Sequence, residues 1–325
     1  MSLFDCSSFR TDRDCRDRSL QQHPPDVSNP PDQFRQGLNA LPLAFLRIAR
    51  PENVIITALS VVVAGVISNP HWTTFIIDLI VAALSAGLIA AGGNAFNDVC
   101  DRDLDRTQKP HRPIPAGQIT VRAAIYWTAG CFVIGLTLAL RIGGMAFLIA
   151  SWAVFLLLLY SWRWKRLPLV GNLSVAFVAS LAFIYGGVAV RSIGVAFWAA
   201  WLAFFFHLGR EIVKDLEDRS GDAAAHADTF VVRYGEGAGR YAAVLAFILL
   251  SFSLLLPYYL GGFRIEYLVV ALLGVFPVLV LGAVAIWRWT TPEQLHRLNL
   301  ILKWDMLVGL AALLVGRPAA ESLVL

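Results

Sequence analysis

The chain has 325 residues, of which 57% are hydrophobic and 15% are charged, and its mean hydropathy is +0.63. A soluble domain carries about 25% charged residues, so this composition excludes an ordinary soluble protein. The formal net charge of +4 comes from basic residues spread over short loops rather than gathered in one patch. That distribution predicts contact with anionic membrane lipids and gives no reason to expect a nucleic-acid partner.

The first 40 residues differ from the rest of the chain. Residues 1–40 are polar, rich in Arg, Asp, Ser, Gln and Pro, and contain no apolar core of the kind a signal peptide needs. Their composition predicts a disordered cytoplasmic tail. Residues 41–318 are expected to form a transmembrane domain, and residues 319–325 a short C-terminal tail.

Apolar segments recur along the predicted domain. Spanning an apolar layer of about 30 Å takes roughly 20 helical residues. Nine stretches approach this length and are nearly free of charge: 54–68, 76–93, 121–140, 146–160, 173–190, 193–207, 241–260, 265–287 and 298–315. They are continuous and rich in Leu and Ala, without the alternation of a membrane β-barrel. The sequence predicts an all-α membrane protein, a bundle of about nine transmembrane helices.

Basic residues divide unequally between the two sides of such a bundle. All but four of the 27 Lys and Arg residues lie in the N-terminal segment or in loops on its side. The exceptions are Arg141, Arg191, Arg264 and Arg317. The positive-inside rule therefore predicts a cytoplasmic N-terminus and an external C-terminus. The long loops 100–120 and 210–240 fall on the cytoplasmic side, where functional residues are expected.

Acidic and amide side chains gather where the second apolar segment ends. The chain there reads Asn94-Ala-Phe-Asn97-Asp98-Val-Cys-Asp101-Arg-Asp-Leu-Asp105. At 100° per residue, a single narrow stripe of a helix contains Asn94, Asn97, Asp98, Asp101 and Asp105. Such a stripe places several ligand oxygens side by side.

A second stripe of the same kind follows the sixth apolar segment. It contains Glu211, Asp215, Asp218 and Asp222. Like charges at this spacing weaken a helix by roughly 0.2–0.5 kcal/mol per pair, so a cation is expected to neutralise them. One alternative is that both runs are merely solvated helix ends. Two same-face stripes on one side of the membrane argue against it.

Oxygen ligands without Cys or His suit Mg²⁺, which completes its coordination with water and phosphate oxygens. We expect one ion at each motif. The ligands predicted for the first are Asn97, Asp101 and Asp105, and those for the second are Asp218 and Asp222.

The motifs also resemble those of a known family. The resemblance covers roughly residues 41–318 and rests on Asn97-x-x-x-Asp101-x-x-x-Asp105, Arg112-Pro-Ile-Pro-Ala-Gly117, Tyr160-Ser-x-x-x-Lys165, Gly171-Asn172, Asp218-x-x-x-Asp222 and Met306-Leu-Val-Gly-Leu310. These motifs are similar to those of the UbiA superfamily of intramembrane prenyltransferases. The resemblance implies an enzyme that moves a prenyl group from its diphosphate onto an acceptor, with Mg²⁺ as cofactor.

Basic side chains near the first motif are expected to hold the diphosphate, because the Arg fork and the Lys ammonium suit phosphate oxygens. They lie after the first motif and in the next cytoplasmic loop: Arg102, Lys109, Arg112, Arg163 and Lys165. Tyr160 joins them through its place in the resembling motif.

Within the superfamily, the segment 210–222 most resembles the digeranylgeranylglyceryl phosphate synthase branch. That resemblance implies transfer of a geranylgeranyl group onto a lipid acceptor, geranylgeranylglyceryl phosphate. Arg210 and Lys214 are expected to bind the acceptor phosphate. A hydroxyl acceptor needs a base, and the candidates left open are Asp98, Glu211 and Asp215.

Two other functions remain open at this point. The same enzyme class acting on an aromatic or tetrapyrrole acceptor shares parts of the pattern. An ion or proton-coupled transporter also uses intramembrane carboxylates, but here they lie at helix ends rather than near the midplane. The lone His207 is expected to be a packing residue. The sequence specifies neither the prenyl chain length nor the oligomeric state.

Overall fold

The computed structural model describes residues 32–225 and 227–319, and its contacts divide the chain into Met1–Asn39 and Ala40–Leu325. Most of the predicted tail therefore lies outside the described residues. Residues 32–40, which the sequence assigned to that tail, form the beginning of helix α1 (Asp32–Ala49). Apolar residues at helical spacing extend this helix into the larger unit, where Ala44 and Ile48 are buried.

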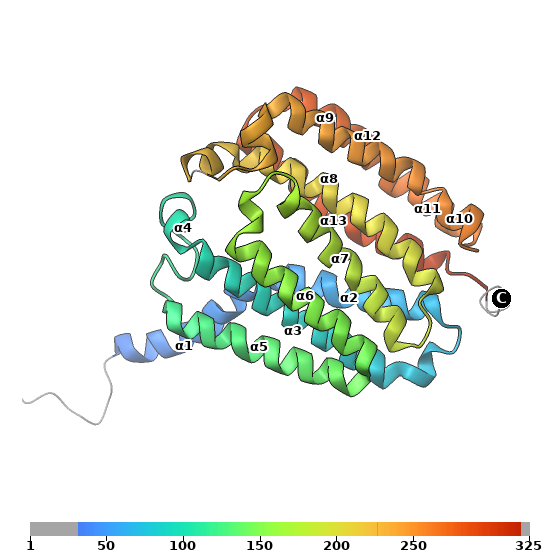
Figure 1. Cartoon of the computed structure of the whole chain (residues 1–325), viewed down its shortest axis with the longest axis horizontal. Helices are drawn as coiled ribbons and strands as arrows, with labels where there is room; N and C mark the ends of the chain where they lie inside the picture. The colour runs from blue at the N-terminus through green and yellow to red at the C-terminus, as the bar shows by residue number, and fades with distance from the viewer. Residues whose placement is uncertain (1–31, 226, 320–325) are drawn as a thin grey trace, which may run out of the picture. The chain divides into compact units, whose positions relative to one another are not determined.

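The described residues of Ala40–Leu325 are helical apart from their connections, as expected for an all-α bundle (Figure 1). After α1, the helices are α2 (Pro51–Ser68), η1 (Trp72–Phe75), α3 (Ile76–Cys100), α4 (Arg102–Gln108), α5 (Val121–Ile142), α6 (Gly144–Trp162), η2 (Trp164–Arg166), α7 (Val170–Ala189), α8 (Gly194–Ala224), α9 (Phe230–Ser253), α10 (Leu256–Leu260), α11 (Ile265–Val270), η3 (Ala271–Val275), α12 (Phe276–Arg288) and α13 (Pro292–Val315).

Eight helical segments among the described residues are long and apolar enough to cross a membrane. They correspond to eight of the nine predicted segments. The ninth, 193–207, forms the first half of the 31-residue helix α8, whose second half carries the second acidic motif. The chain is an integral, multi-pass membrane protein with a helical bundle of the predicted kind.

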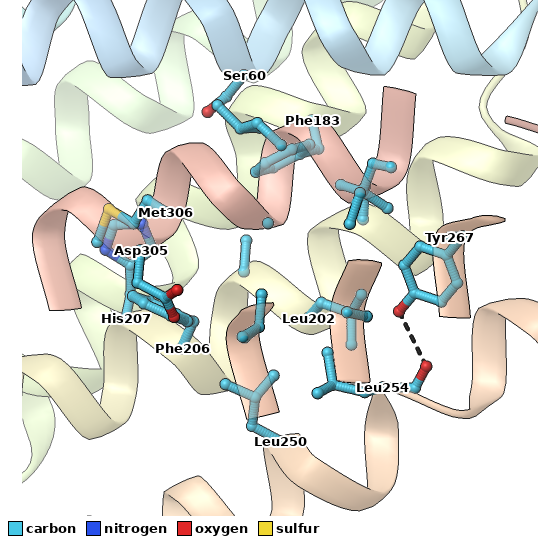
Figure 2. Close-up of a pocket in the computed structure, with 18 of the residues that line it drawn as sticks. Ser60, Phe183, Leu202, Phe206, His207, Leu250, Leu254, Tyr267, Asp305 and Met306 are labelled. Atoms are coloured by element: carbon cyan, nitrogen blue, oxygen red, sulfur yellow. Dashed lines mark hydrogen bonds between the residues drawn. The ribbon is translucent and has the colours of Figure 1, made fainter. Parts of the chain in front are cut away.

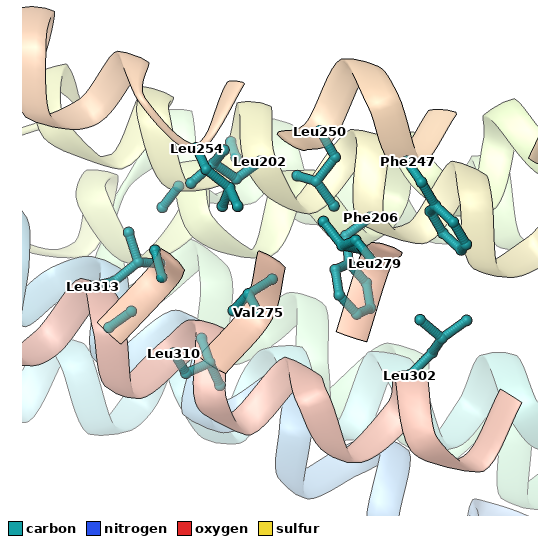
Figure 3. Packing of buried hydrophobic residues seen from close by; sticks show 14 of the residues in the cluster. Leu202, Phe206, Phe247, Leu250, Leu254, Val275, Leu279, Leu302, Leu310 and Leu313 are labelled. Carbon is teal, nitrogen blue, oxygen red and sulfur yellow. The ribbon is translucent and has the colours of Figure 1, made fainter. Parts of the chain in front are cut away.

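Apolar side chains fill the bundle in two main clusters. One joins α2, α3, α5, α6 and α7, and the other joins α8, α9, η3, α12 and α13. Figure 3 shows the second cluster, to which α8 contributes Phe206, α9 contributes Leu250 and α13 contributes Leu310. Many other large apolar side chains are exposed on the outside of the helices, where a lipid environment accommodates them.

Helices α2 and α7 approach each other closely at a glycine. A Cβ atom placed on Gly186 would lie 2.2 Å from the carbonyl oxygen of Val61. Small residues allow such backbone contact between membrane helices. The contact fixes the spacing of the helices that carry the bundle core.

Three connections meet at one end of the bundle. Figure 1 shows α4 and the end of α8 on the same side, and the side chain of Gln108 in α4 packs directly over Gly221 of α8. The backbone N–H of Asp228, after α8, donates to the carbonyl of Arg166, before α7, at 3.1 Å. The loops that follow α3, α6 and α8 are thus brought together.

The Gly186 contact generates a prediction about stability. We expect Gly186→Ala to destabilise the fold by about 1–3 kcal/mol, because the added methyl group overpacks the α2–α7 contact. The matched control is Gly130→Ala in α5, where an added Cβ meets nothing within 4 Å of it. Denaturant unfolding of the detergent-solubilised proteins should show a lower midpoint for Gly186→Ala alone. Equal midpoints for the two variants would contradict the close approach.

Candidate active site

The first motif lies on one continuous helical path from α3 into α4. The N–H of Asp101 donates to the carbonyl of Asn97 at 2.9 Å, and the N–H of Asp105 donates to the carbonyl of Asp101 at 2.8 Å. Helical hydrogen bonding therefore continues through the junction of the two helices. The predicted stripe therefore continues from α3 into α4, on either side of Asp101.

Arg112 draws the loop after α4 back onto this stripe. Its Nη1 lies 2.6 Å from Asp105 Oδ2 and 3.1 Å from Asp98 Oδ1. Asp98 also accepts from Arg50 Nη2 at 2.5 Å, so two guanidinium groups neutralise one buried carboxylate. Arg50 precedes Pro51 and has a left-handed backbone (φ 54°). Its role was not predicted, because the pairing joins residues 48 positions apart.

Lys165 approaches the first motif from the loop between α6 and α7. Its Nζ lies 2.5 Å from Asp101 Oδ1 and 3.4 Å from Asn97 Oδ1. Asn97 in turn donates from Nδ2 to Asp101 Oδ2 at 3.0 Å. An ammonium group thus lies between an amide oxygen and a carboxylate oxygen that were both predicted to bind a cation.

The first two carboxylates of the second motif, on α8, both have hydrogen-bond partners. Glu211 is buried and lies 3.3 Å from Arg210 Nη1 and 3.4 Å from Lys214 Nζ. Asp215 accepts from Asn172 Nδ2 of α7 at 2.9 Å. Together with Asp98, all three predicted bases therefore have hydrogen-bond partners.

Lys109, which follows the first motif in the chain, forms an ion pair with the second motif. Its Nζ lies 3.8 Å from Asp218 Oδ2, and it follows directly after α4 in the chain. Asp222 lies one turn beyond Asp218 on α8. The structure therefore brings the two predicted acidic stripes to the same end of the bundle, with the loop after α4 between them.

Burial disfavours the charged form of a carboxylate at the end of each motif, beyond the apolar spans. Burial raises the pKa of Asp105 above its ordinary value, although the neighbouring Arg112 opposes the shift. Burial, with help from Asp218, raises the pKa of Asp222 to about 6. Desolvation disfavours each carboxylate charge, and an added cation would favour it.

The remaining predicted site residues lie in different environments. Arg102 is half-exposed and pairs with Asp103 at 3.4 Å, and Arg163 is exposed. Neither contacts the stripe carboxylates in the described part of the chain. Tyr160 of α6 lies within electrostatic range of charged residues of both motifs, Lys214 and Asp101. The structure brings Lys109, Arg112, Lys165 and Tyr160 to the site.

The donor atoms suit a hard cation, although they are not arranged as a ready-made cage. Within 32–225 and 227–319, no group of three or more His, Cys, Asp or Glu side chains could hold a metal ion as placed. The oxygens of Asn97 and Asp101 already face a cation, the ammonium of Lys165. All five predicted ligands offer oxygen, the donor that Mg²⁺ prefers. The residues fit a divalent ion that displaces basic side chains.

One buried polar residue, Asp305, was missed by the sequence analysis. Asp305 of α13 is 5% exposed and lines an apolar cavity together with His207 of α8. The available signal was a carboxylate in the middle of the apolar stretch 298–315, since intramembrane ionisable residues are rare and usually functional. The prediction that His207 is a packing residue stays a prediction.

Comparison with known proteins agrees with this geometry. Residues 54–306 match the model of the UbiA prenyltransferase family. The chain belongs to this family. It is therefore a membrane prenyltransferase, and the transporter alternative is set aside. The match covers most of the chain and both acidic motifs.

Two relatives carry the name digeranylgeranylglyceryl phosphate synthase. The chain is 37% identical over 273 residues to a digeranylgeranylglyceryl phosphate synthase from Methanopyrus kandleri, covering 84% of this chain and 98% of the relative. It is 33% identical over 276 residues to the synthase of the same name from Thermococcus kodakarensis, covering 84% and 97%.

Solved structures share the fold. A structure described as giving insights into the biosynthesis of digeranylgeranylglyceryl phosphate synthase in membranes aligns with a TM-score of 0.70 and 27% identity, covering 87% of this chain and 99% of that one. A UbiA homologue from Archaeoglobus fulgidus, bound to GPP and Mg²⁺, aligns with a TM-score of 0.65 and 21% identity, covering 83% and 99%.

Proposed function

We propose that this UbiA-family chain uses Mg²⁺ to transfer a geranylgeranyl group from its diphosphate onto geranylgeranylglyceryl phosphate. The observation that carries the proposal is the meeting of two carboxylate stripes at one end of an apolar bundle, with basic side chains between them. The Archaeoglobus fulgidus homologue bound to GPP and Mg²⁺ supports the donor and the metal. The names of the relatives support the acceptor.

The metal ligands are proposed to be Asn97, Asp101 and Asp105 at one position and Asp218 and Asp222 at the other. When bound there, Mg²⁺ supplies Lewis acidity and absorbs charge that develops on the departing diphosphate. The carboxylates of this chain fix where that positive charge lies. Burial raises the pKa values of Asp105 and Asp222, and a bound cation would favour their charged forms and lower those pKa values.

Basic side chains are proposed to exchange partners when substrate binds. Lys109, Arg112 and Lys165 now neutralise motif carboxylates at distances between 2.5 and 3.8 Å. With these carboxylates holding Mg²⁺, the three basic side chains would be free to bind the diphosphate oxygens through charge-assisted hydrogen bonds. Arg102 and Arg163, both more exposed, are proposed to contribute long-range attraction to the anionic substrate.

The bundle interior is proposed to protect the allylic cation that forms when the C1–O bond breaks. Tyr160 lies within electrostatic range of Lys214 and Asp101, and an aromatic ring is a side chain that can stabilise positive charge. Apolar helices exclude water, which would otherwise capture the cation. The role of proton acceptor for Asp98, Glu211 or Asp215 stays a prediction.

The acceptor brings a phosphate of its own, and Arg210 and Lys214 are proposed to bind it. Both lie within 3.4 Å of Glu211, one helical turn apart. The Nε of Arg210 is buried without a partner among the described residues, so a donor is free for an incoming anion. An arginine that keeps an unused donor beside a membrane surface suits phosphate recognition.

The active site is proposed to face the cytoplasm of an integral cell-membrane protein. If α8 crosses the membrane with the eight apolar segments, nine crossings place the two chain ends on opposite sides. The excess of basic residues on the side of the acidic motifs then orients that side inward.

The orientation predicts where two reporters lie. A reporter inserted between Ala225 and Ala227, after α8, should be cytoplasmic, and one fused after Leu325 should be external. Enzyme activity and glycosylation of paired reporter fusions measure this. If both reporters lie on the same side, one of the three apolar segments after α8 does not cross the membrane, and the model of nine crossings is wrong.

The metal ligands generate a prediction about activity. We expect Asp101→Ala and Asp218→Ala each to abolish transfer of label from geranylgeranyl diphosphate, and the double variant to be little worse, because the two motifs act as a unit. Asp103→Ala is the matched control, since Asp103 lies in the same segment but its side chain is 70% exposed. Near-normal turnover in either single variant would remove that motif from the reaction centre.

The acceptor site predicts a selective effect of Lys214→Met. A charge-assisted hydrogen bond to phosphate contributes roughly 1.5–3 kcal/mol, so the KM for the acceptor should rise about tenfold to a hundredfold. The KM for the prenyl diphosphate should change little. Steady-state kinetics with each substrate varied in turn test this. Faster prenylation of a neutral aromatic acceptor by the unaltered enzyme would contradict the assigned acceptor.

A further inference from the structure

The end of α8 that carries the second motif is held by few apolar contacts. Leu216 is the last buried residue of this helix, and residues 217–224 are half-buried or exposed. Apolar packing therefore fixes α8 only up to Leu216, two residues before Asp218. Polar contacts have to hold the remaining residues, because a helix end with few buried apolar contacts opens locally at low cost.

Glu217 supplies such contacts, and it makes them with α13. Its Oε1 lies 2.8 Å from His296 Nδ1, and its Oε2 accepts from Asn299 Nδ2 at 2.5 Å. His296 and Asn299 are three positions apart, so they lie next to each other on one face of α13. The carboxylate is 18% exposed, and both of its oxygens are used. One side chain of α8 is thus bound at two points of a second helix.

The beginning of α13 is well fixed and can support this contact. In its capping box, Thr291 Oγ1 accepts from the N–H of Gln294 at 3.4 Å, and Gln294 Oε1 accepts from the N–H of Thr291 at 3.3 Å. Such a box satisfies backbone donors that the first turn would otherwise leave unpaired. Further along, both helices line one apolar cavity, to which α8 contributes His207 and α13 contributes Asp305 (Figure 2). The two helices are therefore neighbours from that cavity to the contact of Glu217.

Glu217 is not part of the carboxylate stripe. At 100° per residue, it lies about 100° from Asp218 and about 140° from Asp222 around the helix axis. Its partners on α13 also differ from Lys109, which pairs with Asp218. The stripe and Glu217 therefore face different neighbours. The contact with α13 fixes how the end of α8 is rotated, and so the direction in which the stripe points.

Asn299 indicates that this contact serves more than stability. Its Oδ1 is buried without a hydrogen-bond partner within the described ranges, while its Nδ2 donates to Glu217. A buried amide oxygen without a partner costs stability, and an apolar side chain of similar size would avoid that cost. An amide at this position is explained by what it does for Glu217.

We propose that Glu217 is a positioning residue: with His296 and Asn299, it holds the end of α8 so that Asp218 and Asp222 present their oxygens to a divalent metal ion. The inference rests on the proposed function, which assigns these two aspartates as ligands. Glu217 itself does not bind the metal. Removal of a group that orients metal ligands typically weakens metal binding about tenfold to a hundredfold.

The test is equilibrium binding of Mn²⁺, a paramagnetic substitute for Mg²⁺, to the purified full chain without any prenyl diphosphate. Electron paramagnetic resonance measures the loss of the free-ion signal. The unaltered chain should bind Mn²⁺ at both motifs, and Asp218→Ala should lose the site of the second motif. Glu217→Ala should weaken that same site about tenfold to a hundredfold. Glu217→Gln keeps an oxygen acceptor for Asn299 and should bind nearly as tightly as the unaltered chain.

Unfolding measurements separate positioning from a simple loss of stability. Asn299→Leu removes the unpaired buried oxygen together with the hydrogen bond to Glu217, so its midpoint of denaturant unfolding should stay close to that of the unaltered chain. Its affinity for Mn²⁺ should nevertheless fall. Glu293→Gln is the matched control, since Glu293 is an exposed carboxylate at the start of the same helix, and it should change neither quantity.

The outcomes distinguish this inference from the proposed reaction. Unchanged Mn²⁺ binding in Glu217→Ala, no Mn²⁺ binding by the unaltered chain, or equal weakening in Glu293→Gln would each overturn the positioning role. So would a loss of affinity that appears only in variants that are destabilised. Metal binding that depends on Glu217, without transfer to a glycerol lipid, would reject the proposed acceptor and keep the positioning role.

Discussion

The neutralisation of carboxylates at one end of an apolar bundle is the interaction on which the structure of this site depends. Helices α3, α4 and α8 carry two acidic stripes out of the apolar layer, where burial already disfavours the charges of Asp105 and Asp222. Without counter-charges these stripes would repel each other and the helix ends would separate. Arg50, Arg112 and Lys165 instead pair with the first stripe, and Lys109 pairs with the second.

This need for positive charge also explains how the loops are folded. The loop after α4 turns back because Arg112 pairs with Asp98 and Asp105, and the α6–α7 loop is held by Lys165. Buried ion pairs contribute little net stability compared with apolar packing, so they are weak evidence for a purely structural role. The proposed exchange of these basic groups between carboxylate and diphosphate would explain them through binding of a charged substrate.

Much of this arrangement could be predicted from the sequence, because helical periodicity alone places the carboxylates on shared faces. Asn97, Asp101 and Asp105 remain aligned across the junction of α3 and α4. The pairing of Arg50 with Asp98 could not be predicted, since tertiary packing joins them across 48 positions. The start of α1 within the predicted tail was also missed. Composition indicated that this region is polar, but composition alone does not show that a helix of the domain begins within it.

The central claim is that divalent metal and both motifs serve prenyl transfer to an alcohol. The most direct test incubates the purified chain with labelled geranylgeranyl diphosphate and geranylgeranylglyceryl phosphate, with Mg²⁺ and then with the metal removed by EDTA. The account predicts a labelled ether lipid that forms with Mg²⁺, disappears on chelation and returns when Mg²⁺ is restored. Product formation that is indifferent to chelation, or no ether product in the presence of Mg²⁺, would contradict it.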